Sequence, residues 1–408
     1  MTDKKRSAIE AIHYLLRQFP CVAVLGARQV GKTTLLRQLL PNAAWFDLEN
    51  SADFDRITHD PLFFLSEVEA PVIFDEAQLC PDLFKALRVK IDDNRKRNGQ
   101  YLISGSSSPE LLRSISETLA GRVAIYVLEP FAWEESWQKP ISNIYTMLVE
   151  QNFDLLKTLT PQFDATQLYT SCLFGGYPEP FLKLKDPLFY DIWMDNYFKT
   201  YINRDIRRLF PTLQIETFKR FIRMMAFSSG EIINFSNFAR SLDVSQPTAK
   251  HYFEIAEGTF LWRSLKTYSK SKKSVIKMPK GHMRDPGIVT HLLNLKTIND
   301  LKSHPNYGRL WESAVIEQII KGMTTTLHSF EPFYYRTKNQ AEIDLILEGK
   351  FGAIPIEIKS GTQTSPQQLL TLKSFVEENN CPVGIVINQA TEVQKLSPTI
   401  IQIPASCL

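Results

Sequence analysis

The stretch that most constrains this chain is a glycine-rich loop near its N-terminus. It reads Gly26-Ala27-Arg28-Gln29-Val30-Gly31-Lys32-Thr33-Thr34 and fits the pattern G-x-x-x-x-G-K-[ST] of a phosphate-binding loop. The apolar run from Cys21 to Leu25 predicts a buried strand before the loop, and the segment from Lys32 to Leu40 predicts a helix that ends at Pro41. Because the motif requires strand, loop and helix in this order, the sequence predicts a nucleotide-binding site.

Each part of the loop has a chemical role in binding ATP and Mg²⁺. The backbone N–H groups of the loop and the positive end of the helix dipole would cradle the phosphates. Lys32 would reach the β- and γ-phosphates, and Thr33 would bind Mg²⁺ through its hydroxyl, with Thr34 a weaker candidate. The alternative is a turn that binds nothing, which the ordered strand, loop and helix disfavour.

A second apolar run ends in two carboxylates. It reads Pro71-Val72-Ile73-Phe74-Asp75-Glu76. At the carboxyl end of a buried strand, Asp75 can face the Mg²⁺ ion bound by Thr33, directly or through water. Glu76 would orient and deprotonate the water that attacks the γ-phosphate. The alternative is that both carboxylates only cap the next element.

Two further positions are candidates for contact with the nucleotide. Ser106 or Ser107, after the predicted strand 101–104, would sense the γ-phosphate or cap the following helix. Arg122 precedes the predicted strand 123–128 and would act as an arginine finger, reaching the γ-phosphate of a neighbouring subunit, or form a surface salt bridge. The strands up to this point alternate with helices, which predicts a parallel α/β sheet that ends near residue 130.

Composition limits the class of protein. The 408 residues allow two or three domains, and the 22% charged and 44% hydrophobic residues are typical of globular proteins. A formal net charge of +3 is too small to indicate nucleic acid by itself. The five cysteines are an odd number without a C-x-x-C pair, and no apolar stretch is long enough to span a membrane. We therefore expect a cytoplasmic protein with no membrane partner.

The middle of the chain predicts a helix-turn-helix. Three short helices are expected between Phe218 and Tyr268, and Ser245 can cap the third, which begins near Pro247. The polar residues expected on the third helix are Gln246, Thr248, Lys250 and His251. A basic segment without acidic residues follows, with Arg263, Lys266, Lys270, Lys272, Lys273, Lys277, Lys280 and Arg284. These residues would contact DNA phosphates as a wing, or the module would only pack against other domains.

Near the C-terminus, two strands are expected at 341–347 and 353–359. If they pair as a hairpin, Asp344 lies near Glu357, and the two carboxylates can share a divalent metal. Lys359 lies on the same face as Glu357 and would position water or stabilise charge on a scissile phosphate. Glu312, on a preceding helix, would be a third ligand, with Glu317 as the alternative. An ordinary strand with a surface ion pair is the other interpretation.

These motifs occur in the order found in a known prokaryotic family. The chain resembles the AAA-fold ATPases whose C-terminal part, a domain of unknown function, combines a winged helix with a restriction-endonuclease-like PD-(D/E)xK domain. The resemblance rests on the loop at 26–34, the strand end at Asp75, the motifs at 105–108, 119–122 and 175–179, and the set Asp344, Glu357 and Lys359. It implies an AAA-type domain at 1–135, a helical linker at 136–210, a winged helix at 211–285 and an α/β nuclease-like domain at 286–408.

The resemblance also implies Mg²⁺-dependent binding and hydrolysis of ATP through Lys32, Thr33, Asp75 and Glu76. Two functions remain open at this point. In one, ATP turnover controls how the winged helix and the nuclease-like domain engage DNA. In the other, the protein is a regulatory ATPase whose C-terminal modules bind a protein partner. Assembly into a homo-oligomer is compatible with both functions, and it would allow Arg122 to act as an arginine finger in a neighbouring subunit.

Overall fold

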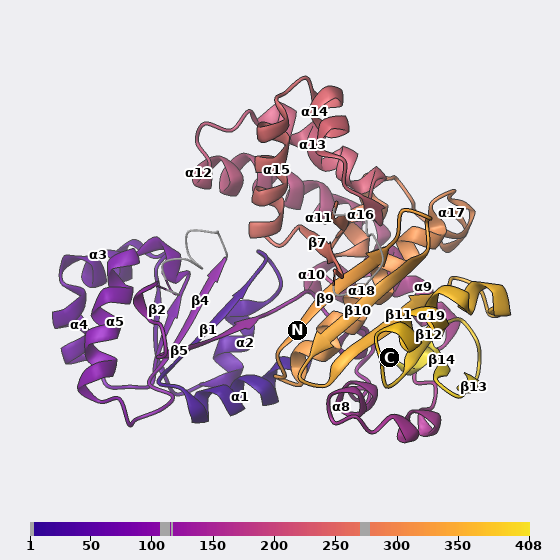
Figure 1. Ribbon diagram of the computed structural model, residues 1–408. Coiled ribbons are helices and arrows are strands. Elements are labelled where there is room, and N and C mark those ends of the chain that lie inside the picture. The colour runs from indigo at the N-terminus through magenta and orange to yellow at the C-terminus, as the bar shows by residue number, and fades with distance from the viewer. Residues whose placement is uncertain (1–3, 107–114, 116, 270–277) are drawn as a thin grey trace. The chain divides into compact units, whose positions relative to one another are not determined.

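The computed structural model describes residues 4–106, 115, 117–269 and 278–408 (Figure 1). The chain divides into two compact units. The first consists of Met1–Pro130 and Glu254–Leu261, and the second of Phe131–Phe253 and Trp262–Leu408. Over the described ranges, no helix has both the length and the apolar character that crossing a membrane requires.

The first unit is built on a parallel five-stranded sheet. Its order is β2-β3-β4-β1-β5, and every neighbouring pair is parallel, which confirms the predicted parallel α/β sheet. The elements of this unit are α1 (Ala8–Gln18), β1 (Cys21–Gly26), α2 (Lys32–Leu39), β2 (Ala44–Asp47), α3 (Ser51–His59), α4 (Pro61–Glu67), β3 (Val72–Asp75), η1 (Ala77–Leu79), α5 (Pro81–Asp93), β4 (Tyr101–Ser106) and β5 (Val123–Val127).

The central strands of this sheet are apolar because they are covered on both faces. All residues of β1 and β3 are buried. Phe46 of β2, Phe64 of α4 and Phe74 of β3 pack together, with the Phe46 ring centroid 4.8 Å from that of Phe64 and 5.9 Å from that of Phe74. Since the strands are parallel, the carboxyl ends of β1, β3 and β4 meet at one edge of the sheet, where the predicted nucleotide site lies.

The second unit begins with helices. They are α7 (Trp133–Trp137), α8 (Ile144–Val149), η2 (Phe153–Thr158), α9 (Ala165–Phe174), α10 (Pro178–Leu182), α11 (Pro187–Thr200), the π-helix η3 (Tyr201–Ile206), α12 (Arg207–Leu209), α13 (Ile215–Phe227), α14 (Phe235–Leu242) and α15 (Gln246–Gly258). The last residues of α15, from Glu254 on, are counted with the first unit. The three predicted short helices are present as α13, α14 and α15. These helices pack through aromatic side chains: the ring centroid of Phe221 lies 5.8 Å from that of Phe238 and 4.8 Å from that of Phe253. Asp243, at φ 56°, ends α14 in the left-handed conformation and forms the turn.

The rest of the second unit contains a nine-stranded mixed sheet of order β13-β14-β12-β11-β10-β9-β7-β8-β6. Its elements and the helices between them are β6 (Glu231–Ile232), β7 (Trp262–Thr267), β8 (Lys280–Met283), α16 (Pro286–Leu292), α17 (Ile298–Ser303), α18 (Tyr307–Thr325), β9 (Phe330–Arg336), β10 (Glu342–Gly349), β11 (Gly352–Ile358), η4 (Pro366–Leu369), α19 (Leu370–Glu378), β12 (Gly384–Asn388), β13 (Gln394–Ser397), β14 (Ile400–Pro404) and η5 (Ala405–Cys407).

One parallel strand pair, β7 with β9, joins strands β6, β7 and β8 to strands β9–β14 of this sheet. In it, Lys266 of β7 pairs with Phe333 of β9, and Thr267 pairs with Tyr334. The hairpin β7–β8 is therefore hydrogen-bonded, through β9, to the sheet that contains β10 and β11. The sheet runs across the boundary predicted at 285/286, and this continuity brings β8 into the neighbourhood of β10.

Candidate functional site

The glycine-rich loop of the first unit wraps around the side chain of Lys32. Lys32 is buried, and its Nζ donates to the carbonyl oxygens of Gly26 at 3.2 Å and Ala27 at 3.0 Å. Gly31 caps α2 with φ 89°, a conformation that favours glycine. At Gly26, a Cβ atom would lie 2.2 Å from the carbonyl oxygen of Leu128, so a side chain does not fit there. The backbone has the compact form expected of a phosphate-binding loop.

The other residues of the loop differ in exposure. Ala27 and Val30 are buried, Arg28 is half-buried, and Gln29, Thr33 and Thr34 are exposed. The loop is held from outside by Arg6, whose Nη1 donates to the carbonyl oxygen of Val30 and whose Nη2 donates to that of Glu129, both at 2.7 Å. Arg6 was not among the predicted residues, because a basic residue near an N-terminus carries no signal of such a contact.

The predicted pair Thr33 and Asp75 is brought together. Thr33 Oγ1 donates to Asp75 Oδ2 at 2.7 Å, and the Asp75 side chain is buried. Ser104 of β4 donates to the other oxygen, Asp75 Oδ1, and accepts from the backbone N–H of Glu76 at 3.2 Å. Since β4 lies between β1 and β3, Ser104 stands beside Asp75 at the carboxyl edge of the sheet. The only signal for it in the sequence was its position as the first polar residue after the apolar run from Tyr101 to Ile103.

Glu76 lies directly after this edge. Its backbone is in the left-handed conformation with φ 53°, and its Oε2 accepts from Gln78 Nε2 at 2.5 Å. A non-glycine residue with positive φ next to a buried carboxylate is a feature typical of functional sites. Gln78, which the sequence did not indicate, orients the Glu76 carboxylate.

Two predicted contacts with the nucleotide have different outcomes. The backbone of Ser106 ends β4 opposite Gly26, but its side chain and Ser107 lie outside what the structure describes. Arg122 lies at the wrong end of the sheet for its own site, because its carbonyl accepts from the N–H of Cys21, the first residue of β1. Its guanidinium pairs with Asp92 at 2.7 Å and 2.8 Å. This arrangement favours the salt bridge, and contact of Arg122 with the γ-phosphate of a neighbouring subunit stays a prediction.

The predicted hairpin of the second unit is confirmed, and it places Asp344 near Glu357. Leu345 of β10 pairs with Ile356 of β11, so the next residues outward, Asp344 and Glu357, are opposite each other. Asp344 Oδ2 accepts from the backbone N–H of Ile358 at 2.8 Å, and Lys359 Nζ lies 2.5 Å from Glu357 Oε1.

The expected basic wing is partly wrong, because Lys280 is buried among these carboxylates. Its Nζ lies 2.5 Å from Glu312 of α18, and 2.6 Å from Glu342 and 3.5 Å from Asp344 of β10. Only 4% of Lys280 is exposed. We call Glu312, Glu342, Asp344 and Glu357, together with Lys280 and Lys359, the carboxylate cluster. Lys280 cannot contact DNA from this position.

The other residues of the expected wing have four different outcomes. Arg284 is buried, and burial lowers its pKa to about 10. Arg263 pairs at 2.5 Å with the buried Glu317, so this carboxylate belongs to another contact and is not a ligand of the cluster. Lys266 is exposed, as predicted. The remaining lysines lie beyond the described ranges: Lys270, Lys272, Lys273 and Lys277.

Burial and mutual repulsion act on the carboxylate cluster. Burial raises the pKa of Glu312 above its usual range, and the Asp344 charge adds to this while Lys280 opposes it. Burial also raises the pKa of Glu357; the Asp344 charge raises this pKa further, whereas Lys359 lowers it. Burial acts to lower the pKa of Lys280, but the three neighbouring carboxylates outweigh it and raise that pKa. The cluster therefore favours a cation at its centre.

Oxygen ligands of this type suit Mg²⁺ or Mn²⁺. Glu357 Oε2 is buried and has no hydrogen-bond partner, which makes it a candidate ligand atom. However, in the part of the chain that the structure describes, no group of three or more His, Cys, Asp or Glu side chains is arranged to hold a metal ion. Glu312, Asp344 and Glu357 are thus near one another, but in an arrangement that holds lysine.

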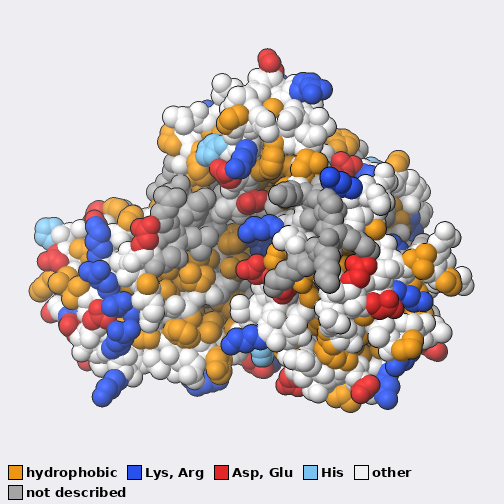
Figure 2. Space-filling model, viewed as in Figure 1, with side chains coloured by type: hydrophobic (Ala, Val, Ile, Leu, Met, Phe, Trp, Pro, Cys, Tyr) orange, Lys and Arg blue, Asp and Glu red, His pale blue; other side chains and the backbone are white. Residues whose placement is uncertain are grey.

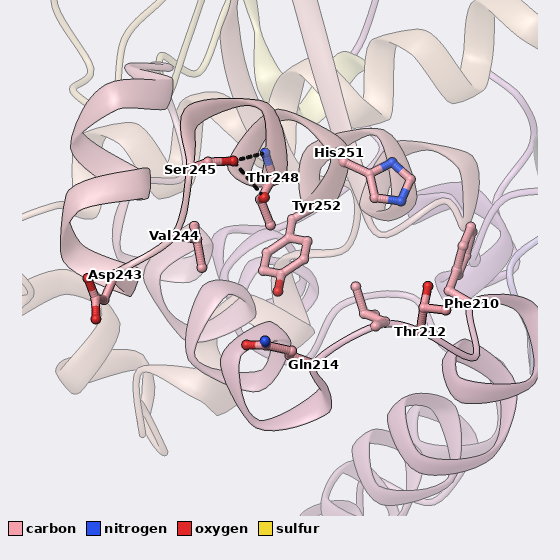
Figure 3. Close-up of a pocket in the computed structure, with 10 residues that line it drawn as sticks. Phe210, Thr212, Gln214, Asp243, Val244, Ser245, Thr248, His251 and Tyr252 are labelled. Atoms are coloured by element: carbon pink, nitrogen blue, oxygen red, sulfur yellow. Dashed lines mark hydrogen bonds between the residues drawn. The ribbon is translucent and has the colours of Figure 1, made fainter.

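The helix-turn-helix has a pocket beside its turn. Figure 3 shows the residues around this cavity of about 380 Å³, which lies between the Asp243–Ser245 turn, the start of α15 and the segment from Phe210 to Gln214. Ser245 accepts from the backbone N–H of Thr248 at 3.2 Å, which confirms it as the cap of α15. Gln246, Lys250 and His251 are exposed and Thr248 is half-buried, so α15 presents a polar surface near its N-terminus.

Comparison with family models supports the nucleotide site. Residues 18–137 match an AAA domain. Residues 165–299 and 307–408 match two domains of unknown function, DUF8612 and DUF4143. Together with the geometry of the loop, the first match identifies the N-terminal part as an AAA-type P-loop ATPase domain. The other two matches assign no activity to the second unit.

The chain is also similar to uncharacterized relatives and, more distantly, to solved structures. Two uncharacterized proteins, Mb2031c of Mycobacterium bovis and Rv2008c of Mycobacterium tuberculosis, are each 29% identical over 409 residues, covering 99% of this chain and 84% of theirs. The Walker-type ATPase PABY2304 of Pyrococcus abyssi is similar at 15% identity and a TM-score of 0.45, over 70% of this chain and 94% of that one. The STAND protein PH0952 of Pyrococcus horikoshii, with a tetratricopeptide repeat sensor, matches at 13% identity and a TM-score of 0.28, over 80% and 50%. Likenesses this distant do not assign a function.

Proposed function

We propose that this chain is a Mg²⁺-dependent ATPase whose second unit engages DNA. The observation that carries the ATPase part is the 2.7 Å hydrogen bond from Thr33 to Asp75, which joins the phosphate-binding loop to the acidic end of β3. Thr33 and Asp75 are the residues that would hold Mg²⁺, and the ion would neutralise charge on the phosphates. Lys32 would bind the β- and γ-phosphates, Glu76 would orient the attacking water, and Ser104 and Gln78 would position the two carboxylates.

The DNA part is supported by the helix-turn-helix of the second unit, and exposed positive charge on the first unit offers a further contact with phosphates. In such a motif, residues near the N-terminus of the second helix enter the major groove, and Gln246 and Lys250 of α15 are exposed there. Figure 2 shows a row of Lys and Arg side chains on the first unit, on the side where Figure 1 places α5. The exposed basic residues on and after α5 are Lys85, Arg88, Arg95, Lys96 and Arg97. Charges of this kind bind phosphates without sequence preference.

We further propose a nuclease-like, metal-dependent site at the carboxylate cluster. The order α18-β9-β10-β11-α19-β12 in the chain, with β11 and β12 parallel, is compatible with the endonuclease-like fold expected from the resemblance. Asp344 and Glu357 would bind the metal, with Glu312 from α18, and Lys359 would stabilise charge on the scissile phosphate. Incubation of DNA with Mg²⁺ or Mn²⁺ should then give cleavage that Asp344→Ala removes while ATP hydrolysis continues. Cleavage of equal rate in that variant would contradict the assignment.

A second candidate function is a regulatory ATPase whose second unit binds a protein. The burial of Lys280 and Arg284 favours it, because these cations, counted toward a DNA-binding wing, are not accessible to DNA. This function predicts slow turnover, tight retention of nucleotide and a partner that co-purifies.

Steady-state ATP hydrolysis separates the two functions. It should be measured with and without duplex, single-stranded and branched DNA. Lys32→Ala should abolish hydrolysis, whereas Lys296→Ala, which changes an exposed lysine paired with Asp191, should not affect turnover. Stimulation by DNA, reduced by alanine at both Gln246 and Lys250, supports the first function. Hydrolysis that depends on Lys32 and is indifferent to every DNA supports the second.

A further inference from the structure

The backbone of Lys280 is fixed in the interior of a sheet. Lys280 is the first residue of β8 and pairs with Leu265 of β7 on one side and Ile232 of β6 on the other. Its side chain is buried, so the ammonium group has exchanged water for protein contacts. Removal of an ammonium group from water is unfavourable by several kcal/mol unless carboxylates replace the water. Glu312, Glu342 and Asp344 make that replacement.

The charges of this region nearly balance around Lys280. Four carboxylates face three cations. The carboxylates are Glu312, Glu342, Asp344 and Glu357, and the cations are Lys280, Lys359 and Arg336, which pairs with Glu342 at 2.8 Å. With every group ionised, four negative and three positive charges leave a net charge of −1. A divalent ion added beside Lys280 would bring this to +1 and would place the ion within a few ångströms of an ammonium group. A divalent ion in place of the Lys280 ammonium would bring it to zero, which is favourable at low dielectric.

One buried carboxylate oxygen of the cluster, Glu357 Oε2, has neither a hydrogen bond nor an ion pair among the described residues. Glu357 Oε1 pairs with Lys359, while Oε2 is buried and without a hydrogen-bond partner. A buried carboxylate oxygen in this condition is rare and calls for an explanation. A metal ion bound between Asp344 and Glu357 would use it, whereas the Lys280 ammonium lies among Glu312, Glu342 and Asp344.

We propose that Lys280 is the resident cation of the carboxylate cluster, and that a divalent metal ion binds there only by displacing its ammonium group. This inference rests on the proposed metal-dependent site and specifies its regulation: Lys280 lowers the affinity of the cluster for metal. The displaced side chain leaves its contacts with Glu312, Glu342 and Asp344 and becomes accessible to solvent. A motion of β8 that withdrew Lys280 would raise the metal affinity in the same way.

The first test is direct binding of Mn²⁺ to the full, nucleotide-free chain by titration calorimetry. Lys280→Met removes the charge and keeps the length of the side chain, and it should bind Mn²⁺ at least about tenfold more tightly than the unaltered protein. Lys280→Arg keeps the charge and should stay within about threefold of the unaltered protein. Adding Asp344→Asn to Lys280→Met should remove the gain. An unchanged affinity in a folded Lys280→Met chain overturns the proposal.

A second test needs no variant, in case Lys280→Met fails to fold. An amine-reactive reagent should modify Lys280 slowly in the metal-free chain, and saturation with Mn²⁺ should raise the extent of modification at least about fivefold because the side chain is displaced. Peptide mass spectrometry measures this, and Lys85, whose side chain is 75% exposed, provides the reference that should not change. Saturating Mn²⁺ that leaves Lys280 protected overturns the proposal.

These tests also separate the inference from the function on which it rests. Mn²⁺ binding that Asp344→Asn abolishes, with no gain in Lys280→Met, keeps the metal site and overturns the role of Lys280. Failure of both the unaltered chain and Lys280→Met to bind Mn²⁺ at millimolar concentration removes the metal site, and it overturns the inference too, since Lys280 would then be a permanent structural cation. Tighter binding by Lys280→Met without any DNA cleavage supports the inference and contradicts only the nuclease activity.

Discussion

Asp75 of the first unit and Asp344 of the second are both buried carboxylates near strand ends, but different partners hold them. Asp75 accepts from two hydroxyl groups, those of Thr33 and Ser104. Asp344 accepts from a backbone N–H and faces the ammonium group of Lys280, which also pairs with Glu312 and Glu342. Hydroxyl groups have no net charge and leave the negative charge of Asp75 in place, whereas Lys280 compensates that of its neighbours.

The difference explains how each site would respond to a cation. In the proposed function, a Mg²⁺ ion that arrives with ATP would meet a carboxylate held by hydroxyl groups, and the threonine hydroxyl is itself a ligand type for Mg²⁺. A metal ion that arrives at the carboxylate cluster meets a cation already in place. Under the two proposals, the first site would bind metal together with its substrate, and the second would bind metal only after lysine is displaced.

Substitution of Asp75 has the largest expected effect. Asp75→Ala should reduce steady-state hydrolysis of Mg-ATP by about 10³-fold, because the oxygen that would bind the ion is lost. Asp344→Ala, the matching change in the second unit, should leave turnover without DNA within about twofold. Retention of turnover in Asp75→Ala would remove the contrast between the two carboxylates.

The next prediction concerns a buried carboxylate that pairs with an arginine and a histidine but belongs to no proposed site. Glu317 pairs with Arg263 at 2.5 Å and with His282 at 2.8 Å. Although burial acts to raise its pKa, these two partners lower it. Glu317→Gln leaves the Arg263 charge buried without its counterion, so the free energy of unfolding of the second unit should fall by about 3 kcal/mol.

Urea unfolding followed by tryptophan fluorescence measures this effect, because every tryptophan except Trp45 belongs to the second unit. The matched control is Glu216→Gln. The Glu216 side chain is 85% exposed and pairs with Lys219 at 2.8 Å, so the control should change the free energy by less than about 0.5 kcal/mol. Equal stability losses in the two variants would mean that burial does not determine the strength of these pairs.

A smaller effect is expected when a hydroxyl that holds Asp75 is removed. Ser104→Ala leaves Asp75 Oδ1 without that donor, and ATP turnover should fall by about tenfold because the carboxylate is less well positioned. Ser66→Ala removes an exposed hydroxyl on α4 that donates to the carbonyl of Phe63, and it should not alter turnover. A loss of turnover in Ser66→Ala as large as that in Ser104→Ala would contradict a specific role for Ser104.

The same contrast shows what the sequence alone could predict. The strand, the loop and the pairing of Thr33 with Asp75 follow from local patterns and from one rule, that parallel strands present their carboxyl ends at one edge. Ser104 needs the strand order as well, since its contact exists only because β4 lies between β1 and β3. The pattern of apolar residues does not determine that order.

Lys280 could not be predicted from its surroundings in the chain. It lies in a stretch without acidic residues, which favours an exposed, phosphate-binding role. Its partners Glu312 and Glu342 are distant in sequence, and they meet it only because β7 pairs with β9 and joins two groups of strands into one sheet. The hairpin that places Asp344 near Glu357 was predictable, since its strands are adjacent in the chain and the register follows from a short turn.

The last prediction extends the comparison to buried acids without a charged partner, and its expected result is an absence of reaction. All five cysteines are buried. Burial raises the pKa of Cys21 and Cys172 to about 12, with no other cause, and it raises the pKa of Cys381 and Cys407 to about 11. A raised pKa lowers the thiolate fraction, so at pH 8 a thiol of pKa about 12 is ionised in about one molecule in 10⁴.

A disulfide reagent at pH 8 should react with the native chain at least about 10² times more slowly than with the chain unfolded in guanidinium, where every thiol should be labelled. Rapid labelling of Cys21 in the native chain would show that burial alone does not keep an acid neutral here.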